Sequence, residues 1–416
     1  MVNTIQIYEH QRLKLGDQIN GIAFTQQHFE ALIHFQEQHT GKYYKLIHRG
    51  VQFQHYVGVL QVGDLTIEIL PKIGQYYNEK PAHWQRVLID MLAYCQFIKL
   101  ESHTTANQAL QPHAILDLYL SIFVSEVEQL MRQGLVKQYY RDKANLKSLK
   151  GRLVIPVHIR KNTAHQERFF VDVEQYGHDH LLHQILGAAL QMIQRLPISP
   201  TLNGRVLRLL NRFPNITPLK PFPTLQDQPP LNRKQQRYKK AVDIALMLLH
   251  NYHPGLRAGS HNVLAILFDM NLLFEEYIYQ QLLRHSTTEV KIYRQLAKAF
   301  WGRRFLKPDL LVEIEQERFV LDTKWKLATR TTPGMADLRQ IYAYTNQFDA
   351  KHGILLYPAV ESLSEKQSQA IPFAPSLSNN INIDCQLLFI QLIKEERLNR
   401  EIGKELVEVM KNNANI

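Results

Sequence analysis

The stretch KPDLLVEIEQERFVLDTKWK, residues 307–326, decides the fold of the C-terminal third of this chain. Two apolar runs flank a polar turn, a pattern that predicts two adjacent antiparallel strands. Each run nevertheless carries an aspartate, Asp309 or Asp322, where a buried strand would favour an apolar residue. Buried carboxylates are costly unless they are paired or hold a cation. The stretch therefore raises the question of what these two aspartates do.

The predicted register brings the charged side chains together. If the turn is a two-residue loop at Gln316-Glu317, Asp309 lies opposite Lys324 and Asp322 lies opposite Leu311. Side chains alternate across a strand, so the two aspartates and the lysine then project from one face. Two hard oxygen ligands suit Mg²⁺, and a lysine beside them can orient or deprotonate a water and offset charge on a phosphorane. This constellation predicts a metal-dependent, phosphodiester-hydrolysing site.

The same pattern also fits a structural role, an ion-paired strand end in which Asp309 binds Lys324 and Asp322 binds Lys326. Short acidic-x-Lys triplets arise easily by chance, and two others occur elsewhere in the chain. Only Asp322 follows a Phe-Val-Leu run and has a Pro-Asp pair upstream. The motif alone leaves the catalytic and structural interpretations equally open.

Acidic and polar residues on the flanking predicted helices favour the catalytic interpretation. Glu275 on the preceding helix can reach the same metal, whereas Glu276 fits a solvated helix face better. On the following helix, Asp337, Gln340 and Tyr344 are spaced i, i+3 and i+7 and so share one face. That face either lines a DNA groove, with Gln340 and Tyr344 as DNA contacts, or is simply exposed.

Basic and aromatic residues alternate in the segment before Asp309. Basic side chains there can neutralise phosphates, and aromatic side chains can stack on bases or pack in the core. The interleaved residues are Arg294, Lys298, Phe300, Trp301, Arg303, Arg304, Phe305 and Lys307. We expect the phenylalanines in the core and leave Trp301 open between the two roles. The predicted DNA contacts in this segment are Arg303, Arg304 and Lys307.

The composition points to a basic protein of the reducing cytoplasm. A formal net charge of +11 favours a polyanionic partner such as nucleic acid, because binding releases counterions. The charge alone is equally compatible with a basic protein that has no such partner. Two cysteines, Cys95 and Cys385, are too few for a disulfide framework. No apolar run approaches the length of a membrane span, and the N-terminus has no apolar signal core, so we expect neither insertion nor export.

Two further motifs bear on ligands. The sequence lacks the G-x-x-x-x-G-K-[ST] loop that cradles nucleotide phosphates, so any GTP or ATP must be bound by another chain. His178, His180 and His183 are spaced closely enough to suggest zinc. Histidine is abundant, at 19 residues, and no cysteine lies near this cluster, which favours a structural role instead.

A chain of 416 residues is too long for one ordinary core, and its pattern predicts four parts. The predicted parts are a β-rich N-terminal domain at 1–110, a mainly helical middle region with a β hairpin at 111–212, a Pro-rich linker or surface crossing at 213–235, and an α/β domain at 236–416. In the last part we expect the order α-β-β-β-α-β. These elements are a helix at 264–284, strands at 290–296, 307–314 and 319–326, a helix at 335–348 and a strand at 353–357.

This order, with Pro-Asp and Asp-x-Lys on adjacent strands, resembles the PD-(D/E)xK nucleases. More narrowly, the chain resembles the McrC family, the nuclease subunit of the McrBC modification-dependent restriction systems. The matching stretches are YVGVLQVGDLTIEILPKI (56–73), LKGRLVIP (149–156), FDMNLLFEEYI (268–278), KPDLLVEI with FVLDTKWK, and DLRQIYAYTNQF with GILLYP, which begin at 337 and 353. These stretches span most of the chain, which makes the resemblance more specific than the catalytic motif alone.

The resemblance implies a mixed α+β chain whose C-terminal domain has a restriction-endonuclease-like fold. It implies Mg²⁺-dependent cleavage of methylated DNA, in which Asp309 and Asp322 ligate the metal, Lys324 serves the attacking water and Glu275 assists as a ligand. It also implies a partner, an AAA+ GTPase of the McrB type, onto which the N-terminal and middle regions dock and whose hydrolysis they stimulate. Two alternatives stay open: a non-cutting DNA-binding adaptor of an AAA+ ring, and a stand-alone nuclease.

Overall fold

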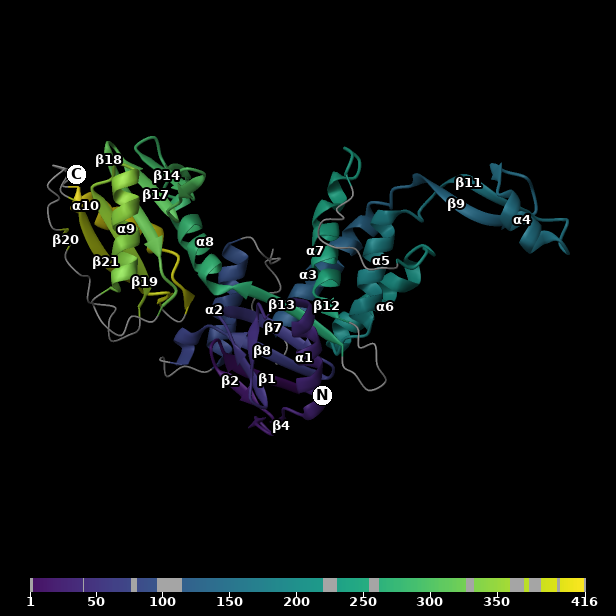
Figure 1. Ribbon diagram of the computed structural model, residues 1–416, viewed down its shortest axis with the longest axis horizontal. Coiled ribbons are helices and arrows are strands. Elements are labelled where there is room, and N and C mark those ends of the chain that lie inside the picture. The colour runs from purple at the N-terminus through teal and green to yellow at the C-terminus, as the bar shows by residue number, and fades with distance from the viewer. Residues whose placement is uncertain are drawn as a thin grey trace. The chain divides into compact units, whose positions relative to one another are not determined.

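The computed structural model describes residues 3–39, 41–75, 81–95, 114–219, 230–253, 262–326, 333–359, 370–373, 383–394 and 397–414. The chain forms two compact units, each continuous in space but not in sequence. Unit 1 consists of Leu116–Ile266 with two short N-terminal pieces, Met1–Asn3 and Gln61–Thr66. Unit 2 consists of Thr4–Leu60, Ile67–Ile115 and Leu267–Ile416. Figure 1 shows both units coloured along the chain.

The N-terminal residues are β-rich, as predicted. The strands are β1 (Asn3–Tyr8), β2 (Arg12–Lys14), β3 (Gln18–Ile19), β4 (Ile22–Ala23), β5 (Tyr44–Ile47), β6 (Gly50–Phe53), β7 (Tyr56–Val62) and β8 (Leu65–Leu70). The helical elements are α1 (Gln26–His39), η1 (Lys72–Gln75) and α2 (Pro81–Tyr94). Alternation at residues 51–59, the Gly63-Asp64 turn and the apolar residues at 65–70 predict a hairpin. Strands β7 and β8 confirm it, since they lie side by side and are buried along their whole length. Helix α1 was not predicted, because its buried face is carried partly by His28 and Ala31 and so gives a weak apolar pattern.

Unit 1 combines a helical body with a separate β ribbon. Its elements are α3 (Ala114–Arg132), β9 (Gln138–Leu146), β10 (Arg152–Leu153), α4 (Ile155–Asn162), β11 (Phe169–Gly177), α5 (Leu181–Gln194), α6 (Pro200–Arg212), η2 (Gln236–Tyr238), α7 (Lys239–His250) and β12 (Tyr252–His253). Strand β11 pairs antiparallel with β9 along nine residues and with β10. Figure 1 shows this ribbon, with α4, extending away from the helices α5 and α6.

The sequence predicted parts of unit 1 incorrectly. The β hairpin predicted in the middle region places its strands at residues 151–157 and 168–173. The first of these strands stops at Leu153, and a helix with proline in its first turn follows. Strand β9 was not predicted, since most of its residues are polar and it is partly or fully exposed throughout. Helical periodicity runs from residue 180 to residue 212 in the sequence, and the structure divides this range into α5 and α6. Ser199 caps α6 by accepting a hydrogen bond from the backbone N–H of Leu202 at 3.4 Å.

The described part of the Pro-rich segment crosses the surface of α5. Residues 220–229 of that segment lie outside the described residues. The backbone N–H and hydroxyl of Thr217 donate hydrogen bonds to the carboxylate of Asp179, at 2.9 and 2.5 Å. A Cβ added at Gly187 would lie 2.3 Å from the Cδ1 of Ile216, so a larger residue there would displace the Ile216 side chain.

Unit 2 contains a six-stranded mixed sheet in its C-terminal part. The elements after β12 are β13 (Val263–Asp269), α8 (Met270–Leu283), β14 (Val290–Arg294), β15 (Lys298–Trp301), β16 (Arg304–Leu306), β17 (Leu310–Ile314), β18 (Glu317–Thr323), α9 (Met335–Gln347), β19 (His352–Pro358), β20 (Ile371–Pro372), β21 (Asp384–Ile390), β22 (Ile393–Lys394), β23 (Arg397–Leu398) and α10 (Ile402–Asn413). The strand order is β14-β17-β18-β19-β21-β20. Strands β18, β19 and β21 are parallel to one another, and the other pairs are antiparallel.

The order α8-β14-β17-β18-α9-β19 confirms the predicted α-β-β-β-α-β arrangement, with one error. The helix expected from residue 264 begins instead at Met270, because residues 263–269 form a strand. A buried helix and a buried strand are both continuously apolar, so periodicity could not separate them. The helix begins after Asp269, whose side chain accepts a hydrogen bond from the N–H of Asn271 at 2.9 Å.

Helix α9 packs directly on one face of this sheet. A Cβ at Gly353 of β19 would lie 2.7 Å from Ile341 of α9, so helix and strand are in close contact. Leu311, Val320 and Leu355 belong to the apolar cluster beneath the helix. Side chains two residues apart share a face of a strand, so Asp309 and Asp322 project toward the α9 side. The chain is thus a mixed α+β protein, and among the helices of its described ranges none is long and apolar enough to cross a membrane.

Candidate active site

The turn between β17 and β18 sets the positions of the two aspartates. Leu310 pairs with Leu321 and Ile314 with Glu317, so the loop is Glu315-Gln316 and the predicted register is wrong by two residues. Continuing this register by one residue sets Asp309 opposite Asp322. A shift of two residues keeps every side chain on its face. The predicted convergence of the charged groups therefore survives the incorrect register.

Asp322 is a buried carboxylate next to a second one. It is 1% exposed, and its Oδ2 lies 2.5 Å from the Nζ of Lys324. Within the described structure this oxygen has no hydrogen bond of good geometry. Burial and the neighbouring charge of Asp309 raise the pKa of Asp322 to about 6, although Lys324 acts in the opposite direction. Asp309 is partly buried, and its Oδ2 accepts hydrogen bonds from the N–H and hydroxyl of Thr323 at 2.7 and 2.8 Å.

Lys324 connects the carboxylates to α9. Its ammonium donates a hydrogen bond to Oε1 of Gln340 at 2.8 Å and lies 3.6 Å from Oδ1 of Asp337. Burial lowers the pKa of Lys324, but the charges of Asp322, Asp337 and Asp309 outweigh burial and leave the pKa above its ordinary value. The lysine therefore stays protonated at neutral pH. This disfavours a role as general base and favours the stabilisation of negative charge.

The observed ion pairs differ from those of the structural interpretation. Lys324 pairs with Asp322, where a pair with Asp309 was expected. Lys326 pairs with Asp337 at 3.1 Å, where a pair with Asp322 was expected. Asp309 thus directs its carboxylate to backbone and hydroxyl donors beside the second aspartate.

The predicted polar face of α9 is turned toward this site. Asp337 is 8% exposed, and Gln340 and Tyr344 are partly buried. Gln340 also contacts the next turn of the helix, because its Nε2 donates a hydrogen bond to the hydroxyl of Tyr344 at 3.0 Å. The face is not simply exposed, and Gln340 and Tyr344 lie where a substrate bound at the carboxylates would approach α9. Their contact with DNA stays a prediction.

Glu275 lies near the carboxylates but has its own partners. It is 5% exposed, and its Oε1 accepts hydrogen bonds from Gln295 Nε2 at 2.7 Å and from Arg294 Nε at 3.4 Å. Burial and the charge of Asp309 raise the pKa of Glu275. Glu276 is also buried, at 8% exposure, and pairs with Arg294. The expectation of a solvated face for Glu276 was therefore wrong.

Gln295 is a site residue that the sequence did not reveal. Its backbone has φ of 45°, in the left-handed region that residues other than glycine seldom adopt. From this position its N–H donates to the carbonyl of Asp309 at 3.0 Å while its side chain holds Glu275. A strained backbone held by contacts on both sides is typical of functional sites. A lone glutamine after a strand carries no sequence signal for this role.

The donor set fits a hard divalent cation held mainly by two aspartates. Carboxylate oxygens with water in the remaining positions suit Mg²⁺, and the Oδ2 of Asp322 is a buried acceptor without a well-formed hydrogen bond. In the part of the chain that the structure describes, no group of three or more His, Cys, Asp or Glu side chains is arranged to hold a metal. The third expected ligand, Glu275, is engaged by Gln295 and Arg294.

Residues from the N-terminal part of unit 2 support the strand end. The indole N–H of Trp325 donates to Oε1 of Glu9 at 2.6 Å, and the same oxygen accepts from the N–H of Lys72 at 2.9 Å. The ammonium of Lys72 in turn donates to the carbonyl of Trp325 at 2.7 Å. The ILPKI and DTKWK stretches, far apart in sequence, therefore meet just after Lys324.

The basic and aromatic segment forms an exposed hairpin, β15–β16. Arg303, Arg304 and Lys307 are exposed, and their contact with DNA stays a prediction. Phe300 and Phe305 are each 60% exposed, and the expectation that they pack in the core was wrong. The sequence of a short apolar run does not show whether its side chains are buried or exposed to solvent.

The histidine cluster is structural. His183 is fully buried, and its two ring nitrogens lie 2.7 Å from the carbonyl of His178 and 3.1 Å from the hydroxyl of Tyr238. His180 Nε2 lies 2.9 Å from the carbonyl of Val136. Burial lowers the pKa of His183 to about 4, so the ring is neutral at pH 7. The zinc alternative has no support from this geometry.

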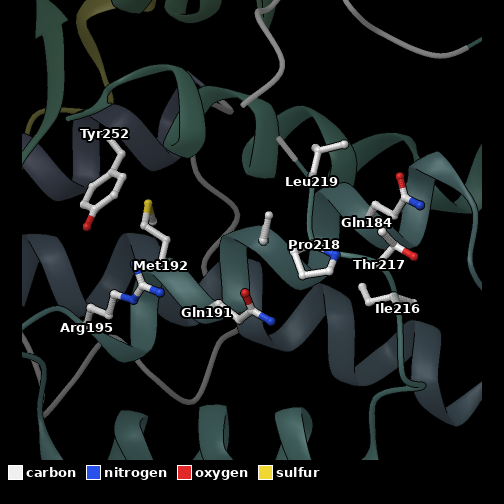
Figure 2. A pocket seen from close by; sticks show the side chains of 10 residues that line it. Gln184, Gln191, Met192, Arg195, Ile216, Thr217, Pro218, Leu219 and Tyr252 are labelled. Carbon is white, nitrogen blue, oxygen red and sulfur yellow. The ribbon is translucent and has the colours of Figure 1, made fainter. Parts of the chain in front are cut away.

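Unit 1 has a cavity of about 640 Å³ between α5 and residues 216–219. Figure 2 shows Arg195, Met192 and Tyr252 at one end and Gln184, Thr217 and Leu219 at the other. Its lining is largely apolar, and it contains no carboxylate among its lining residues. The cavity therefore lacks the chemistry of a hydrolytic site, and the carboxylates of unit 2 are the better candidate.

The fold and the strand-end aspartates define the class of the protein. A mixed sheet flanked by α8 and α9, with Asp309, Asp322 and Lys324 at the ends of adjacent strands, is the arrangement expected of a PD-(D/E)xK domain. A family model described as "McrBC 5-methylcytosine restriction system component" matches residues 51–358. The chain belongs to this McrBC family.

One solved structure agrees with this assignment at the level of the fold, and a second one is less similar. The refined half-complex from a tetradecameric assembly of Thermococcus gammatolerans McrB AAA+ hexamers with bound McrC contains a chain that aligns with a TM-score of 0.68 and 19% identity, over 98% of this chain and 100% of that chain. The cryo-EM structure of the Thermococcus gammatolerans McrBC complex aligns with a TM-score of 0.48 and 21% identity, over 68% and 88% of the two chains. Curated protein sequences give no significant match.

Proposed function

We propose that this chain is the Mg²⁺-dependent DNA endonuclease subunit of a McrBC-type restriction system, and so part of an antiviral defence. The observation that carries the proposal is the meeting of Asp309 and Asp322 at adjacent strand ends with the ammonium of Lys324 2.5 Å from the second carboxylate. Membership of the McrBC family supports the same assignment.

The charged side chains of the site would have different roles in phosphodiester hydrolysis. Asp309 and Asp322 would hold Mg²⁺, which supplies positive charge against the scissile phosphate and favours ionisation of a water. Lys324, protonated and fixed by Gln340, would orient that water and stabilise charge on the phosphorane. Glu275 would assist either as a further ligand or by holding Gln295 in place.

The partner in this proposal is an AAA+ GTPase of the McrB type. Two observations support it: the family assignment and the fold shared with a chain from an assembly of AAA+ hexamers with bound McrC. This sequence has no phosphate-binding loop of its own, so nucleotide hydrolysis falls to the partner. The family resemblance assigns the recognition of methylated DNA to the partner as well. Cys95 and Cys385 are buried free thiols, which suits a cytoplasmic site of action.

The test is cleavage of a methylated duplex by the chain together with its AAA+ partner, with Mg²⁺ and GTP. We expect cutting that requires both proteins and the metal and is abolished by Asp309→Ala. Stimulated nucleotide hydrolysis without cutting would show the non-cutting adaptor instead. Cutting by the chain alone, at the same rate, would show a stand-alone nuclease.

A further inference from the structure

The β15–β16 hairpin presents aromatic side chains to solvent. Phe300 is 60% exposed, Trp301 is 73% exposed and Phe305 is 60% exposed. The turn is made by Gly302 in the left-handed region, and nothing lies within 4 Å of a Cβ placed there. Clusters of exposed aromatic side chains mark sites of interaction, because leaving them in water is unfavourable. The hairpin therefore has an unassigned binding function.

Charge identifies the kind of partner. Lys298, Arg303, Arg304 and Lys307 are interleaved with the aromatic residues, and all four are exposed. The ion pair that the structure gives for this group joins Lys298 to Asp349, at 3.2 Å. Cations alternating with exposed aromatic rings are suited to a nucleic acid strand, in which phosphates and bases alternate.

The hairpin is held next to the carboxylates. At its base, the N–H of Gln295 donates to the carbonyl of Asp309. At its side, Nε2 of Gln347 on α9 donates to the carbonyl of Ala299 at 2.7 Å. Phe305 precedes Asp309 by four residues, so the two lie at most about 14 Å apart along the chain. That distance corresponds to about four base steps of a DNA strand.

We propose that the aromatic side chains of this hairpin, Phe300, Trp301 and Phe305, stack on unstacked bases of the DNA beside the bond that is cut. This inference rests on the proposed function and extends it to the form of the DNA. Bases in a regular duplex already stack on both faces, so they offer no free face to the hairpin. The hairpin therefore requires DNA that is locally unpaired or kinked, as in complexes where apolar side chains insert between base pairs and kink the duplex. The cations beside the rings hold the phosphates of the same strand.

Tryptophan fluorescence tests the proposal directly. Trp84 and Trp325 are 1% and 2% exposed, so Trp301 is the tryptophan accessible to a quencher. The probe is oligo(dT), titrated into the full-length Asp309→Ala chain, and heparin is the polyanion without bases. We expect oligo(dT) to quench the emission and heparin to bind without quenching it. Trp301→Phe should abolish the quenching, and Trp301→Ala should weaken oligo(dT) binding by about tenfold with heparin binding unchanged.

Equal quenching by heparin and oligo(dT) would overturn the inference. The absence of quenching by oligo(dT), at concentrations where it binds, would overturn it too. Quenching by the AAA+ partner without DNA, or by self-association at higher concentration, would assign the hairpin to a protein interface and also overturn it. The readout needs no cleavage, so its failure is distinct from failure of the proposed function. If the wild-type chain did not cut DNA but its fluorescence was still quenched by oligo(dT) and not by heparin, only the proposed nuclease activity would be refuted, and the stacking proposal would stand.

Discussion

The Nζ of Lys324 lies 2.5 Å from the Oδ2 of Asp322, a carboxylate that is 1% exposed. Without metal, this lysine is the positive charge nearest to that oxygen. The two roles considered for the strand end, ion pair and metal site, are therefore built from the same atoms. The two roles predict different changes in protein stability and in cleavage rate when the charge of Asp322 or of Lys324 is removed.

Removal of the Asp322 charge should stabilise the metal-free protein at neutral pH. Burial and Asp309 raise the pKa of Asp322 to about 6 in the folded chain, from 3.8. Between these values the folded state binds more protons than the unfolded state, so stability falls as pH rises from about 4 to 6. Asp322→Asn has no carboxyl group to ionise at this position, so its stability does not fall in this pH range. The variant should therefore be more stable than the wild type at pH 7 by on the order of 2–3 kcal/mol.

Thermal unfolding of both proteins in EDTA, from pH 4 to 7.5, measures this difference. The two curves should converge near pH 4 and separate above pH 6. A wild-type chain that is the more stable of the two at pH 7 would support the structural ion pair instead. Added Mg²⁺ should raise the stability of the wild type and leave Asp322→Asn unchanged, because the variant lacks the ligand.

Lys324→Gln should lower the cleavage rate by about 10²–10³-fold, as for the loss of a group that stabilises transition-state charge. Mg²⁺ affinity should hold or increase, because the ammonium competes for Asp322. The matched control is Lys326→Gln. Lys326 pairs with Asp337 and its side chain is 60% exposed, so this variant should keep nearly the full rate. Single-turnover rates over a Mg²⁺ titration separate the two effects, and a collapse of Mg²⁺ affinity in Lys324→Gln would contradict the assigned role.

Two neighbouring glutamates on α8 provide the next comparison. Glu275→Gln should reduce both Mg²⁺ affinity and cleavage, because Glu275 is electrostatically coupled to Asp309 and holds Gln295. Glu276→Gln changes the adjacent buried carboxylate, which pairs with Arg294, and should reduce cleavage much less. Isothermal titration with Mg²⁺ and cleavage rates test this difference. Equal losses in the two variants would assign Glu275 to the fold of α8 alone.

Much of unit 2 could be predicted because local pattern and topology agree there. The Glu315-Gln316 turn joins two strands whose apolar faces are buried, and an error of two residues in register cannot move Asp309 or Asp322 to the other face. The face that carries the two aspartates was therefore predictable from alternation alone. The ion-pair partners were not, since the observed pairs depend on how α9 approaches the sheet at Gly353.

The features that the sequence missed depend on tertiary contacts. Strand β9 is polar and is stabilised by its pairing with β11, so it has no apolar alternation to detect. Gln295 acquires its role from a left-handed backbone that only the surrounding contacts maintain. Phe300 and Phe305 are exposed, and composition cannot distinguish exposed phenylalanines from buried ones.

Nucleotide hydrolysis should require the partner protein. The chain has no phosphate-binding loop of the Walker type, so the purified chain should turn over neither GTP nor ATP. Added to an AAA+ partner, it should accelerate GTP hydrolysis, and Asp309→Ala should accelerate it equally because the carboxylates belong to a different reaction. Phosphate release assays on the chain, the partner and the mixture measure this. Turnover by the chain alone would contradict the division of labour.

The basic residues of the β15–β16 hairpin should determine how DNA binding depends on salt. Contacts to phosphates carry no base information, and each one releases counterions, with a slope near 0.9 per contact in log K against log salt. Arg303 and Arg304 are both exposed, so changing both to alanine should reduce the slope by about 2 and lower the cleavage rate. The preference for methylated sites should not change, because the proposed function assigns recognition of the modification to the partner.

The matched control is Lys147→Ala with Lys150→Ala, which removes two exposed cations from unit 1 and the same charge from the chain. Titrations of methylated and unmethylated duplexes at several salt concentrations compare the two double variants. An equal drop in slope for both would show that net charge, and not the hairpin, binds DNA. A clear preference of the wild-type chain alone for the methylated duplex would mean that this chain itself reads the modification, and the partner would then be needed for translocation rather than for recognition.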